Sequence, residues 1–438
     1  MELKAGYKPT EVGVLPEDWD VVRLGDLKPF VTSGSRGWAS FYSEYGPLFV
    51  RITNLSRDSI YLDLTDSRHV QLPPGLSEGV RTQLREGDIL ISITADIGIV
   101  GYVDARVPLP AFINQHIALV RVDSAKCSGK FISYFLASEN TQKLFRGSTD
   151  TGAKAGMSLG TVQKMQTALP GFLEQRAIAT ALSDMDALLD GLDRLIAKKR
   201  DLKQAVMQQL LTGRTRLPGF HEPWSARQLG EVGRCLRGVS YRGESDLSPY
   251  DTAHTKRLLR ANNVQESAVV LSDVQFVNAD RVSQPQILKP NDILICMANG
   301  SKALVGKAGL FVVDDGYEYT FGAFMGCFRT EPLRAHPAFV FALLQTDVYL
   351  NYINNLLAGS TINNLRPSSI ESLVFPFPQL AEQTAISTAL SDMDAELAAL
   401  EARRDKTRAL KQGMMQELLT GRTRLVKPEP VEPEPAYA

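Results

Sequence analysis

Two stretches of the sequence carry residue types that could bind phosphate or cut a nucleic acid. Residues 300–308 (GSKALVGKA) combine glycines with lysines, but no Ser or Thr follows the second lysine, so they depart from a phosphate-binding loop. Asp18 and Asp26 precede Lys28 in a carboxylate–lysine arrangement, whereas the later counterpart, residues 231–233, has no lysine. We therefore interpret both stretches as structural.

Metal and thiol chemistry are also unsupported. The four cysteines lie far apart without a C-x-x-C pair, and the five histidines are scattered, so the sequence has neither zinc spacing nor a disulfide framework. The Asn-Pro-Pro-Phe and Asp-Pro-Pro-Tyr tetrapeptides of amino-methyltransferases and a Ser-centred elbow are absent as well. We predict reduced thiols and a chain with no catalytic residue, metal or cofactor of its own.

The elements that could position a binding site are duplicated. Residues 174–217 match residues 382–425 without a gap, at an offset of 208, with 29 identities in 44 positions. Fainter matches precede them: Trp19 with Trp224, Arg51 with Arg260, Asn54 with Asn263, residues 88–91 with 292–295, and Pro170 with Pro378. Each half therefore consists of a domain followed by the repeated segment.

Both repeated segments are predicted to be long helices. In the second, apolar or stem-contributing residues recur in alternating steps of four and three, which is a heptad seam: positions 386, 390, 393, 397, 400, 404, 407, 411, 414 and 418. The first keeps this seam as far as Ile196, and the pattern then predicts a shift to Leu195, Leu202, Val206 and Leu210, as a stutter would give. Each helix, at about 39 residues, would be about 58 Å long.

Connectivity then predicts the architecture. The second domain begins soon after the first helix ends, so we expect the domains at opposite ends of that helix, with the second helix returning antiparallel to bury its seam. The fold class is α+β: two mixed α/β domains separated by an antiparallel two-helix coiled-coil spacer, with a pseudo-two-fold internal repeat. The expected boundaries are domain one, 1–169; helix one, 170–213; linker, 214–223; domain two, 224–377; helix two, 378–421; and a Pro/Glu-rich, disordered tail, 422–438.

Charge and hydropathy restrict the class of protein. No apolar run is long enough to span a membrane, and the N-terminal residues lack a signal-peptide core, so we expect a cytoplasmic protein without a membrane partner. Domain one has 18 basic and 18 acidic residues, and residues 218–377 have 14 basic and 15 acidic residues. DNA-binding proteins usually carry a surplus of basic residues, which these two domains lack. Any binding of DNA phosphates must therefore come from an uneven distribution of charge or from a partner.

The two halves have diverged unevenly. The helices stayed nearly identical while the domains kept only fragments of a common framework. Two equal helical surfaces suit two copies of one partner, and two unequal domains suit two different targets. Linear, asymmetric DNA presents two different targets at a fixed spacing.

At this point the residues suggest a family. GYKPTEVGVLPEDWDVVRLGDL, the paired GDIL and NDIL strands, the LPGFLEQRAIA and FPQLAEQTAIS segments and the two LLTGRTRL endings resemble the DNA-specificity subunit of type I restriction–modification systems. The resemblance covers nearly the whole chain. It implies a non-catalytic reader of a bipartite, asymmetric DNA target with an unread spacer, in which the two domains are target-recognition domains.

The resemblance also implies partners. The helices would bind two methyltransferase subunits, which would carry S-adenosylmethionine, and translocase–nuclease (restriction) subunits would complete the complex. As partner-binding candidates we take Gln204, Gln208, Gln412 and Gln416. The second domain departs from the first in one place, because Phe321-Gly322 stand where Asn114-Gln115 would be expected to recur.

Polar, glycine-punctuated loops are the candidates for reading bases, because Arg can hold guanine and Asn adenine through two hydrogen bonds. The candidate residues are Ser33, Arg36, Trp38, Tyr42 and Lys154 in the first domain, and Arg237, Tyr241, Arg242, Asn363, Asn364 and Arg366 in the second. Two other functions stay open: a protein-binding adaptor built on the same spacer, and an enzyme with an unrecognised site. The chain could equally serve a complex that only methylates.

Overall fold

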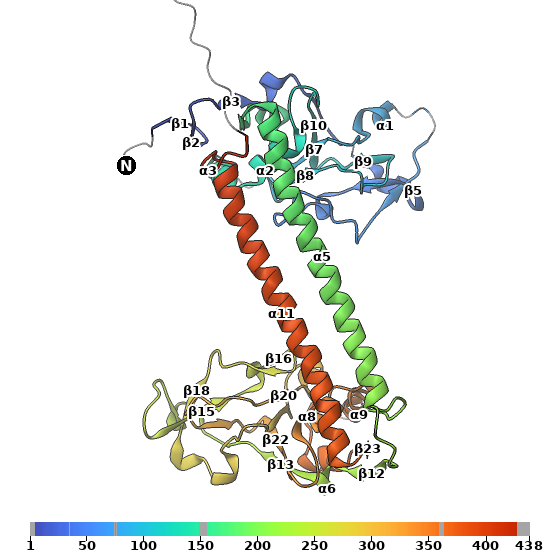
Figure 1. Cartoon of the computed structure of the whole chain (residues 1–438), viewed down its shortest axis with the longest axis vertical. Coiled ribbons are helices and arrows are strands. Elements are labelled where there is room, and N and C mark those ends of the chain that lie inside the picture. Colours follow the sequence, from blue (N-terminus) through green and yellow to red (C-terminus); the bar gives the residue numbers. More distant parts are fainter. Residues whose placement is uncertain are drawn as a thin grey trace, which may run out of the picture. The chain divides into compact units, whose positions relative to one another are not determined.

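The computed structural model describes residues 5–34, 36–73, 75, 77–148, 156–358 and 363–426. The chain forms two compact units, Met1–Asp193 with Ala402–Ala438, and Arg194–Glu401. Each unit contains one mixed α/β domain and part of each of two 39-residue helices, α5 (Phe172–Leu210) and α11 (Leu380–Leu418), as Figure 1 shows. The units therefore divide each long helix, whereas the sequence suggested boundaries at the helix ends.

The first unit is built on two sheets and two strand pairs. The antiparallel main sheet has the order β4 (Phe30–Ser33), β10 (Ile117–Arg121), β7 (Ile89–Ser92), β8 (Val100–Tyr102), and the second sheet has the order β6 (His69–Val70), β5 (Tyr42–Val50), β9 (Ala111–Ile113). The pairs are β1 (Tyr7–Thr10) with β2 (Gly13–Pro16) and β3 (Asp20–Arg23) with β11 (Gln166–Leu169). The helices are α1 (Ser77–Thr82), α2 (Gly129–Ala137), α3 (Glu139–Ser148) and α4 (Leu159–Lys164).

The second unit repeats the two sheets, each with more strands, and has a counterpart of the β3–β11 pair. Its main sheet has the order β13 (Gly233–Arg237), β22 (Met325–Thr330), β19 (Ile293–Cys296), β20 (Ala308–Leu310), β17 (Ala268–Val269), β16 (Val264–Gln265). Its second sheet has the order β14 (Leu247–Ser248), β18 (Gln275–Asn278), β15 (Thr255–Leu259), β21 (Tyr319–Phe321), and β12 (Ser225–Gln228) pairs with β23 (Val374–Phe377). The helices are α6 (Leu229–Val232), α7 (Gly243–Asp246), α8 (Pro337–Leu343), α9 (Asp347–Ala358) and α10 (Pro367–Glu371).

The central strands form where the sequence is apolar and β-branched. Both β7 and β19 are buried along their whole length, because each lies inside a main sheet with the long helices and α2 or α8 packed nearby. In the first unit the core includes Ile178 and Leu182 of α5 together with Leu418 of α11. In the second it includes Leu210 of α5 and Ile386 of α11. Each domain therefore shares its core with the start of one long helix and the end of the other.

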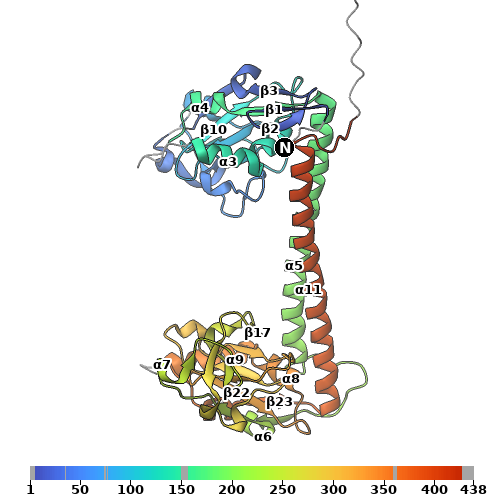
Figure 2. The same ribbon diagram turned by 90° about the vertical axis from the view of Figure 1, so that its left-hand side faces the viewer.

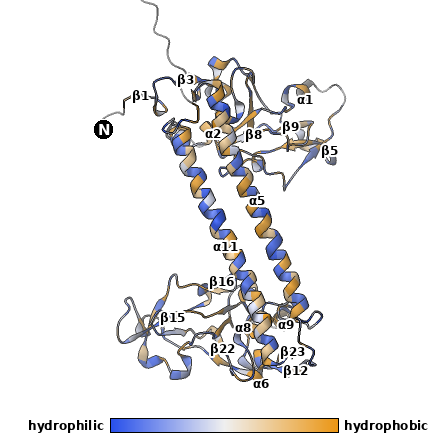
Figure 3. Cartoon of the chain, viewed as in Figure 1, coloured by the Kyte–Doolittle hydropathy of each residue, from blue (hydrophilic) through white to orange (hydrophobic). Residues whose placement is uncertain are grey.

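Within each unit the two helices run antiparallel, side by side in both views (Figures 1 and 2). Arg404 pairs with Asp193 in the first unit, and Lys199 pairs with Glu396 at 2.7 Å in the second. Every position of the expected seam of α11 is buried or half-buried, and Figure 3 shows hydrophobic and hydrophilic residues interspersed along both helices.

The expected stutter in α5 is wrong. After Ile196 the inward positions continue with unchanged spacing through Lys199, Lys203, Val206 and Leu210, which are buried or half-buried. Leu195 and Leu202 are 39% and 48% exposed. The lysines can occupy the seam because their aliphatic stems pack there while their ammonium groups reach carboxylates on α11.

The repeated GRTR endings form a clamp in each unit. Arg424, after α11, donates two hydrogen bonds to Glu174 at the start of α5 (2.6 and 2.7 Å), and Trp19 Nε1 donates to the same carboxylate at 3.2 Å. In the second unit Arg216 and Trp224 bind Glu382 in the same way. The ending of each repeat thus holds the helix start of the other, so the LLTGRTRL motif is a fold determinant.

The adjoining glutamines complete the clamp. Gln175 accepts a hydrogen bond from the Ser128 amide at 2.9 Å and donates to the Pro170 carbonyl, and Gln383 makes the equivalent bonds to His336 and Pro378. These bonds tie α2 and α8 to the long helices. They explain why Pro-x-x-x-Glu-Gln recurs.

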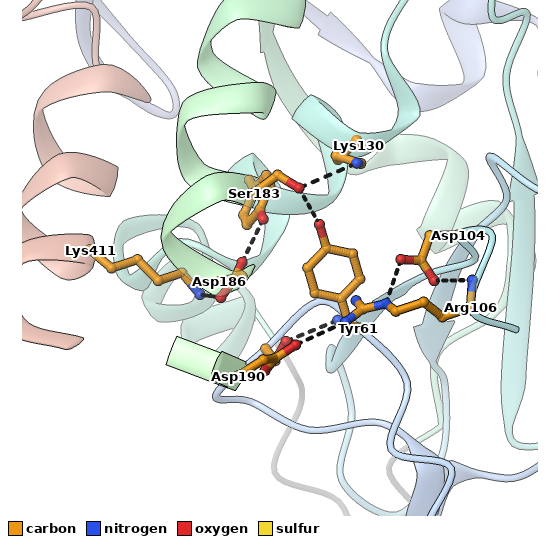
Figure 4. A network of polar contacts seen from close by, with 10 residues as sticks. Tyr61, Asp104, Arg106, Lys130, Ser183, Asp186, Asp190 and Lys411 are labelled. Atoms are coloured by element: carbon orange, nitrogen blue, oxygen red, sulfur yellow. Dashed lines mark hydrogen bonds and ion pairs between the residues drawn. The ribbon is translucent and has the colours of Figure 1, made fainter. Parts of the chain in front are cut away.

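A buried polar network fastens the first domain to the helices (Figure 4). The Lys411 ammonium lies 2.5 Å from the Asp186 carboxylate, and both side chains are less than 10% exposed. The Tyr134 hydroxyl donates to the other Asp186 oxygen at 2.5 Å, and Tyr61 hydrogen-bonds Ser183. Burial raises the pKa of the Tyr134 phenol far above its ordinary value, so it stays a proton donor.

Candidate nucleic-acid interface

In the second domain, four loops meet at the end of strand β19. The Met297 amide donates to the Phe324 carbonyl at 2.9 Å, and its carbonyl accepts from the Leu365 amide at 2.7 Å. Bridges also join Ala298 to Asn364 and Val239 to Gly322. These bonds bring together the segments that follow β13, β19 and β21 and the segment that precedes α10.

The first domain builds the same junction with the same backbone bonds. The Ile93 amide donates to the His116 carbonyl at 2.9 Å, its carbonyl accepts from Met157 at 2.7 Å, and a bridge joins Thr94 to Gly156. Equivalent positions in the two domains can therefore be matched residue by residue. Asn114 corresponds to Gly322, because each donates its amide at 3.0 Å to the last residue of the neighbouring strand, Val50 or Leu259. This corrects the expected alignment of Phe321-Gly322 with Asn114-Gln115 by one residue.

A glycine is required where the first loop crosses this junction. A Cβ on Gly34 would lie 2.1 Å from the Asn114 carbonyl oxygen, and one on Gly238 would lie 2.0 Å from that of Gly322. No side chain fits there, so Ser33-Gly34 and Arg237-Gly238 hold equivalent places. Each glycine also donates its amide to the strand after the β9–β10 or the β21–β22 turn, Gly34 to the Ile117 carbonyl at 3.2 Å and Gly238 to the Met325 carbonyl at 3.3 Å.

The loops of the second domain enclose a cleft of about 890 Å³. Tyr241, Arg260, Asn262, Asn299, Phe324 and Asn363 are among its lining residues. The phenyl ring of Phe324 is 70% exposed. Such a lining combines hydrogen-bonding amides with an aromatic face, which suits a base edge.

The structure brings several of the predicted base-reading residues to this junction. Tyr241 and Asn363 line the cleft, and Asn364 pairs with Ala298 beside it. The side chains of Arg237, Arg242 and Arg366 are exposed, and among the described residues none of them forms an ion pair. An exposed, unpaired guanidinium is what a phosphate contact needs.

The predicted base-reading residues of the first domain differ in their exposure to solvent. Arg36 is exposed, Ser33 ends β4 and its carbonyl accepts from Arg81 at 2.8 Å, and Tyr42 is 48% exposed. Trp38 is a correction: it is only 3% exposed and packs on Phe49, Phe112 and Val70, so burial of its apolar ring makes it part of the core. Lys154 lies outside the described residues.

Sequence reasoning missed the three-residue turn in each domain that faces these loops. In the first domain it is Asn114-Gln115-His116, and in the second Gly322-Ala323-Phe324. His116 is held by Thr94 and by Gln115, whose Nε2 lies 3.0 Å from His116 Nε2. The two turns share no residue, so no repeat signal marks them.

Two matched arginines frame the junction. Arg51 and Arg260 each bind an aspartate, Asp66 or Asp273, at 2.9 Å. Beside them Asn54 and Asn263 are almost fully buried, and each accepts from the arginine amide at 2.9 Å. The sequence match at these positions therefore marks a common scaffold.

The carboxylates considered for nuclease chemistry have structural partners. Asp18 accepts hydrogen bonds from Arg424 at 2.7 and 2.9 Å, which lower the pKa of its carboxyl. Asp26 accepts from the Arg23 amide at 3.1 Å. Within the described ranges no group of three or more His, Cys, Asp or Glu residues could hold a metal ion.

The glutamines predicted to bind a partner are exposed on the helices. Gln412 and Gln416 line a cleft of about 490 Å³ that Arg57 and Gln142 of the first domain also line. Gln208 donates to Asp347 of α9 at 3.2 Å. Gln208, Gln412 and Gln416 thus lie near the C-terminal end of each helix, on the side that faces the domain packed against that end.

Another face of the helices carries identical exposed residues. Lys198 and Leu202 on α5 match Lys406 and Leu410 on α11, and the leucines are 48% and 58% exposed. We call these two stretches the Lys–Leu faces. The same lysine and leucine are therefore exposed at matched positions of both repeats.

A family comparison fits this arrangement. The model of the type I restriction modification DNA specificity domain matches residues 16–198 and again residues 221–408. The chain belongs to this family, which confirms the resemblance drawn from its motifs. None of the described helices is long and apolar enough to cross a membrane.

Similar proteins include the type I restriction enzyme StySPI specificity subunit of Salmonella potsdam, 34% identical over 182 residues, which are 42% of this chain and 38% of that protein. The EcoKI specificity subunit of Escherichia coli (strain K12) is 33% identical over 200 residues, 46% of this chain and 42% of that protein. The matches span only about two fifths of these relatives.

A crystal structure of the type I restriction-modification system S subunit from M. genitalium has a TM-score of 0.57 at 14% identity, covering 95% of this chain and 98% of that chain. At this identity the likeness shows the fold alone.

Proposed function

We propose that this chain is the non-catalytic DNA-reading subunit of a type I restriction–modification complex, and that each domain reads one half of a bipartite target. One observation carries the proposal: the two domains build the same loop junction with the same backbone bonds but place different side chains on it. A common scaffold with exchanged surface residues is what two different half-sites demand.

The helices would set the distance between the half-sites. We propose that α5 and α11 form one antiparallel coiled-coil spacer, supported by the heptad seam and the ion pairs found within each unit. A 39-residue helix is about 58 Å long, enough to cover one turn of DNA, roughly 34–36 Å, with the domains beyond.

The Lys–Leu faces would bind two methyltransferase subunits, which would carry S-adenosylmethionine and transfer the methyl group. Identical exposed residues on both helices support two copies of one partner, because a duplicated surface offers the same contacts twice. Restriction subunits that translocate and cut DNA would join through the same complex. An adaptor that binds only proteins would not need exposed arginines on the loops that meet beside a cleft lined by amides.

Reconstitution tests this function. The purified chain alone should neither methylate nor cut DNA, whereas addition of the cognate methyltransferase should give methylation dependent on S-adenosylmethionine. Native mass measurement should find two methyltransferase copies per chain. Methyl transfer by the chain alone, or full activity with one partner copy, would contradict the proposal.

Matched variants locate the docking surface. Leu202→Asp should remove one methyltransferase copy, and Leu410→Asp added to it should remove both, because each places a charge in an apolar contact. Asp201→Ala is the control, since the other repeat already has alanine at the matched position 409. Unchanged stoichiometry in the Leu202→Asp, Leu410→Asp chain would place docking elsewhere.

A further inference from the structure

The β9–β10 and β21–β22 turns are the most exchanged part of the shared junction. In both, the first residue donates its amide to the neighbouring strand at 3.0 Å and the third accepts at 2.9 Å from the residue after β7 or β19. On this common backbone the first domain carries amide and imidazole groups, and the second carries a hydrogen, a methyl and a phenyl group. The turn therefore changes chemical character without changing its fold.

In the second domain the apolar character is exposed. Phe324 is 70% exposed at a cleft that Asn262, Asn299 and Asn363 line together with small apolar residues, and a phenyl group there does not contribute to the core. The 5-methyl group of thymine is the apolar feature that a major groove presents, and phenylalanine is a suitable contact for it. An aromatic ring kept exposed at this place fits such a contact.

Asn363 faces the same cleft with hydrogen-bonding capacity to spare. Among the described residues its amide makes one side-chain bond, from Nδ2 to the Gly300 carbonyl at 3.2 Å. An asparagine amide has two N–H groups and an acceptor oxygen, so one N–H and the oxygen remain. That pair matches N7 and the N6 amino group of adenine, which share the major-groove edge with the thymine methyl.

We propose that the second domain reads an A·T base pair through the major groove, with Phe324 on the thymine methyl group and Asn363 on the adenine. This assignment rests on the proposed function and makes it specific. The first domain, with Gln115 and His116 at the matched turn positions, makes no such methyl contact. The β21–β22 turn is therefore a specificity determinant of the second half-site.

The test uses the complex of the full chain with its methyltransferase and a duplex bearing the motif that the complex methylates. Thymines of each half-site are replaced one at a time by deoxyuridine, which removes only the methyl group. Deoxyuridine at one position of the second half-site should weaken binding of the duplex about fourfold relative to thymine, the value expected for about 0.8 kcal/mol per buried carbon. Deoxyuridine substitutions in the first half-site should have no effect that depends on Phe324.

The Phe324→Ala complex should bind the thymine and deoxyuridine duplexes equally at that position, which marks a direct contact. Because the ring is exposed, this variant should keep its fold, and Val312→Ala, another exposed apolar residue of the same domain, is the control. Asn363→Ala should lower discrimination for adenine in the same base pair by about 5- to 150-fold, from about 1–3 kcal/mol.

The outcomes are separable. Sequence-specific methylation with no deoxyuridine effect, or with an effect that persists in Phe324→Ala, would overturn this assignment and leave the proposed function standing. A complex that shows no sequence preference at all would overturn both. Loss of the deoxyuridine effect in Phe324→Ala but not in Val312→Ala would establish the contact.

Discussion

The buried Lys411–Asp186 pair gives a stability prediction with an internal control. In Lys411→Met the Asp186 carboxylate, 7% exposed, keeps its hydrogen bond from the Tyr134 hydroxyl but loses its cationic partner. Stranding a buried charge costs about 3–5 kcal/mol, and we expect about 3 kcal/mol because the tyrosine remains. The matched residue in the second unit is Lys203, whose partner Asp394 is 58% exposed. Lys203→Met should cost about 0–1 kcal/mol.

Native-state hydrogen exchange resolves the two units by peptide. Peptides of β7 and β10 should lose about 3 kcal/mol of opening free energy in Lys411→Met, while those of β19 and β22 stay unchanged. Adding Asp186→Leu should restore most of the loss, because an apolar pair of similar volume can replace a buried ion pair. Equal effects of the two lysine variants, or no rescue, would refute this reasoning.

Three further predictions follow from matched positions. Burial lowers the pKa of His336, so the unfolded chain binds a proton at higher pH than the folded chain, and the second unit should lose stability as pH falls below about 6.5. His336→Ser introduces the residue found at the matched position of the first repeat. In this variant the free energy of unfolding by urea should depend less on pH. Arg366→Ala should reduce the slope of log affinity against log salt by about 0.9, measured on cognate and unrelated duplexes, whereas Arg227→Ala should not. One added heptad in both long helices lengthens each by about 10 Å, so the unread spacer of the methylated motif should grow by about two to four base pairs. An unchanged spacer would contradict the proposal that the helices set the distance between the half-sites.

The duplicated helices were the part of the fold most open to prediction. Their seam is a local property of spacing, and α11 buries or half-buries every position that the heptad pattern marks. The predicted stutter in α5 is wrong because polar residues continue the seam after Ile196. Lys199 and Lys203 occupy the seam through carboxylates on the other helix, which spacing along α5 alone cannot reveal.

The clamp and the β9–β10 and β21–β22 turns could not be predicted from the sequence, for different reasons. Arg424 and Glu174 are 250 residues apart, so the GRTR motif was visible while its partner was not. Trp38 follows a polar, glycine-rich stretch of sequence but is buried by side chains from β5 and β9. The turn ending in Phe324 shares no residue with the turn ending in His116, and only the common backbone bonds identify them as equivalent.

Exchange of one domain tests the central claim most directly. Residues 1–169 are replaced by the corresponding domain of another member of the family, and the methylated motif is sequenced in cells that carry the chain with its methyltransferase. We predict a two-part motif in which one half changes while the other half stays the same. A single continuous motif, or a change in both halves, would contradict the account of two independent readers on one scaffold.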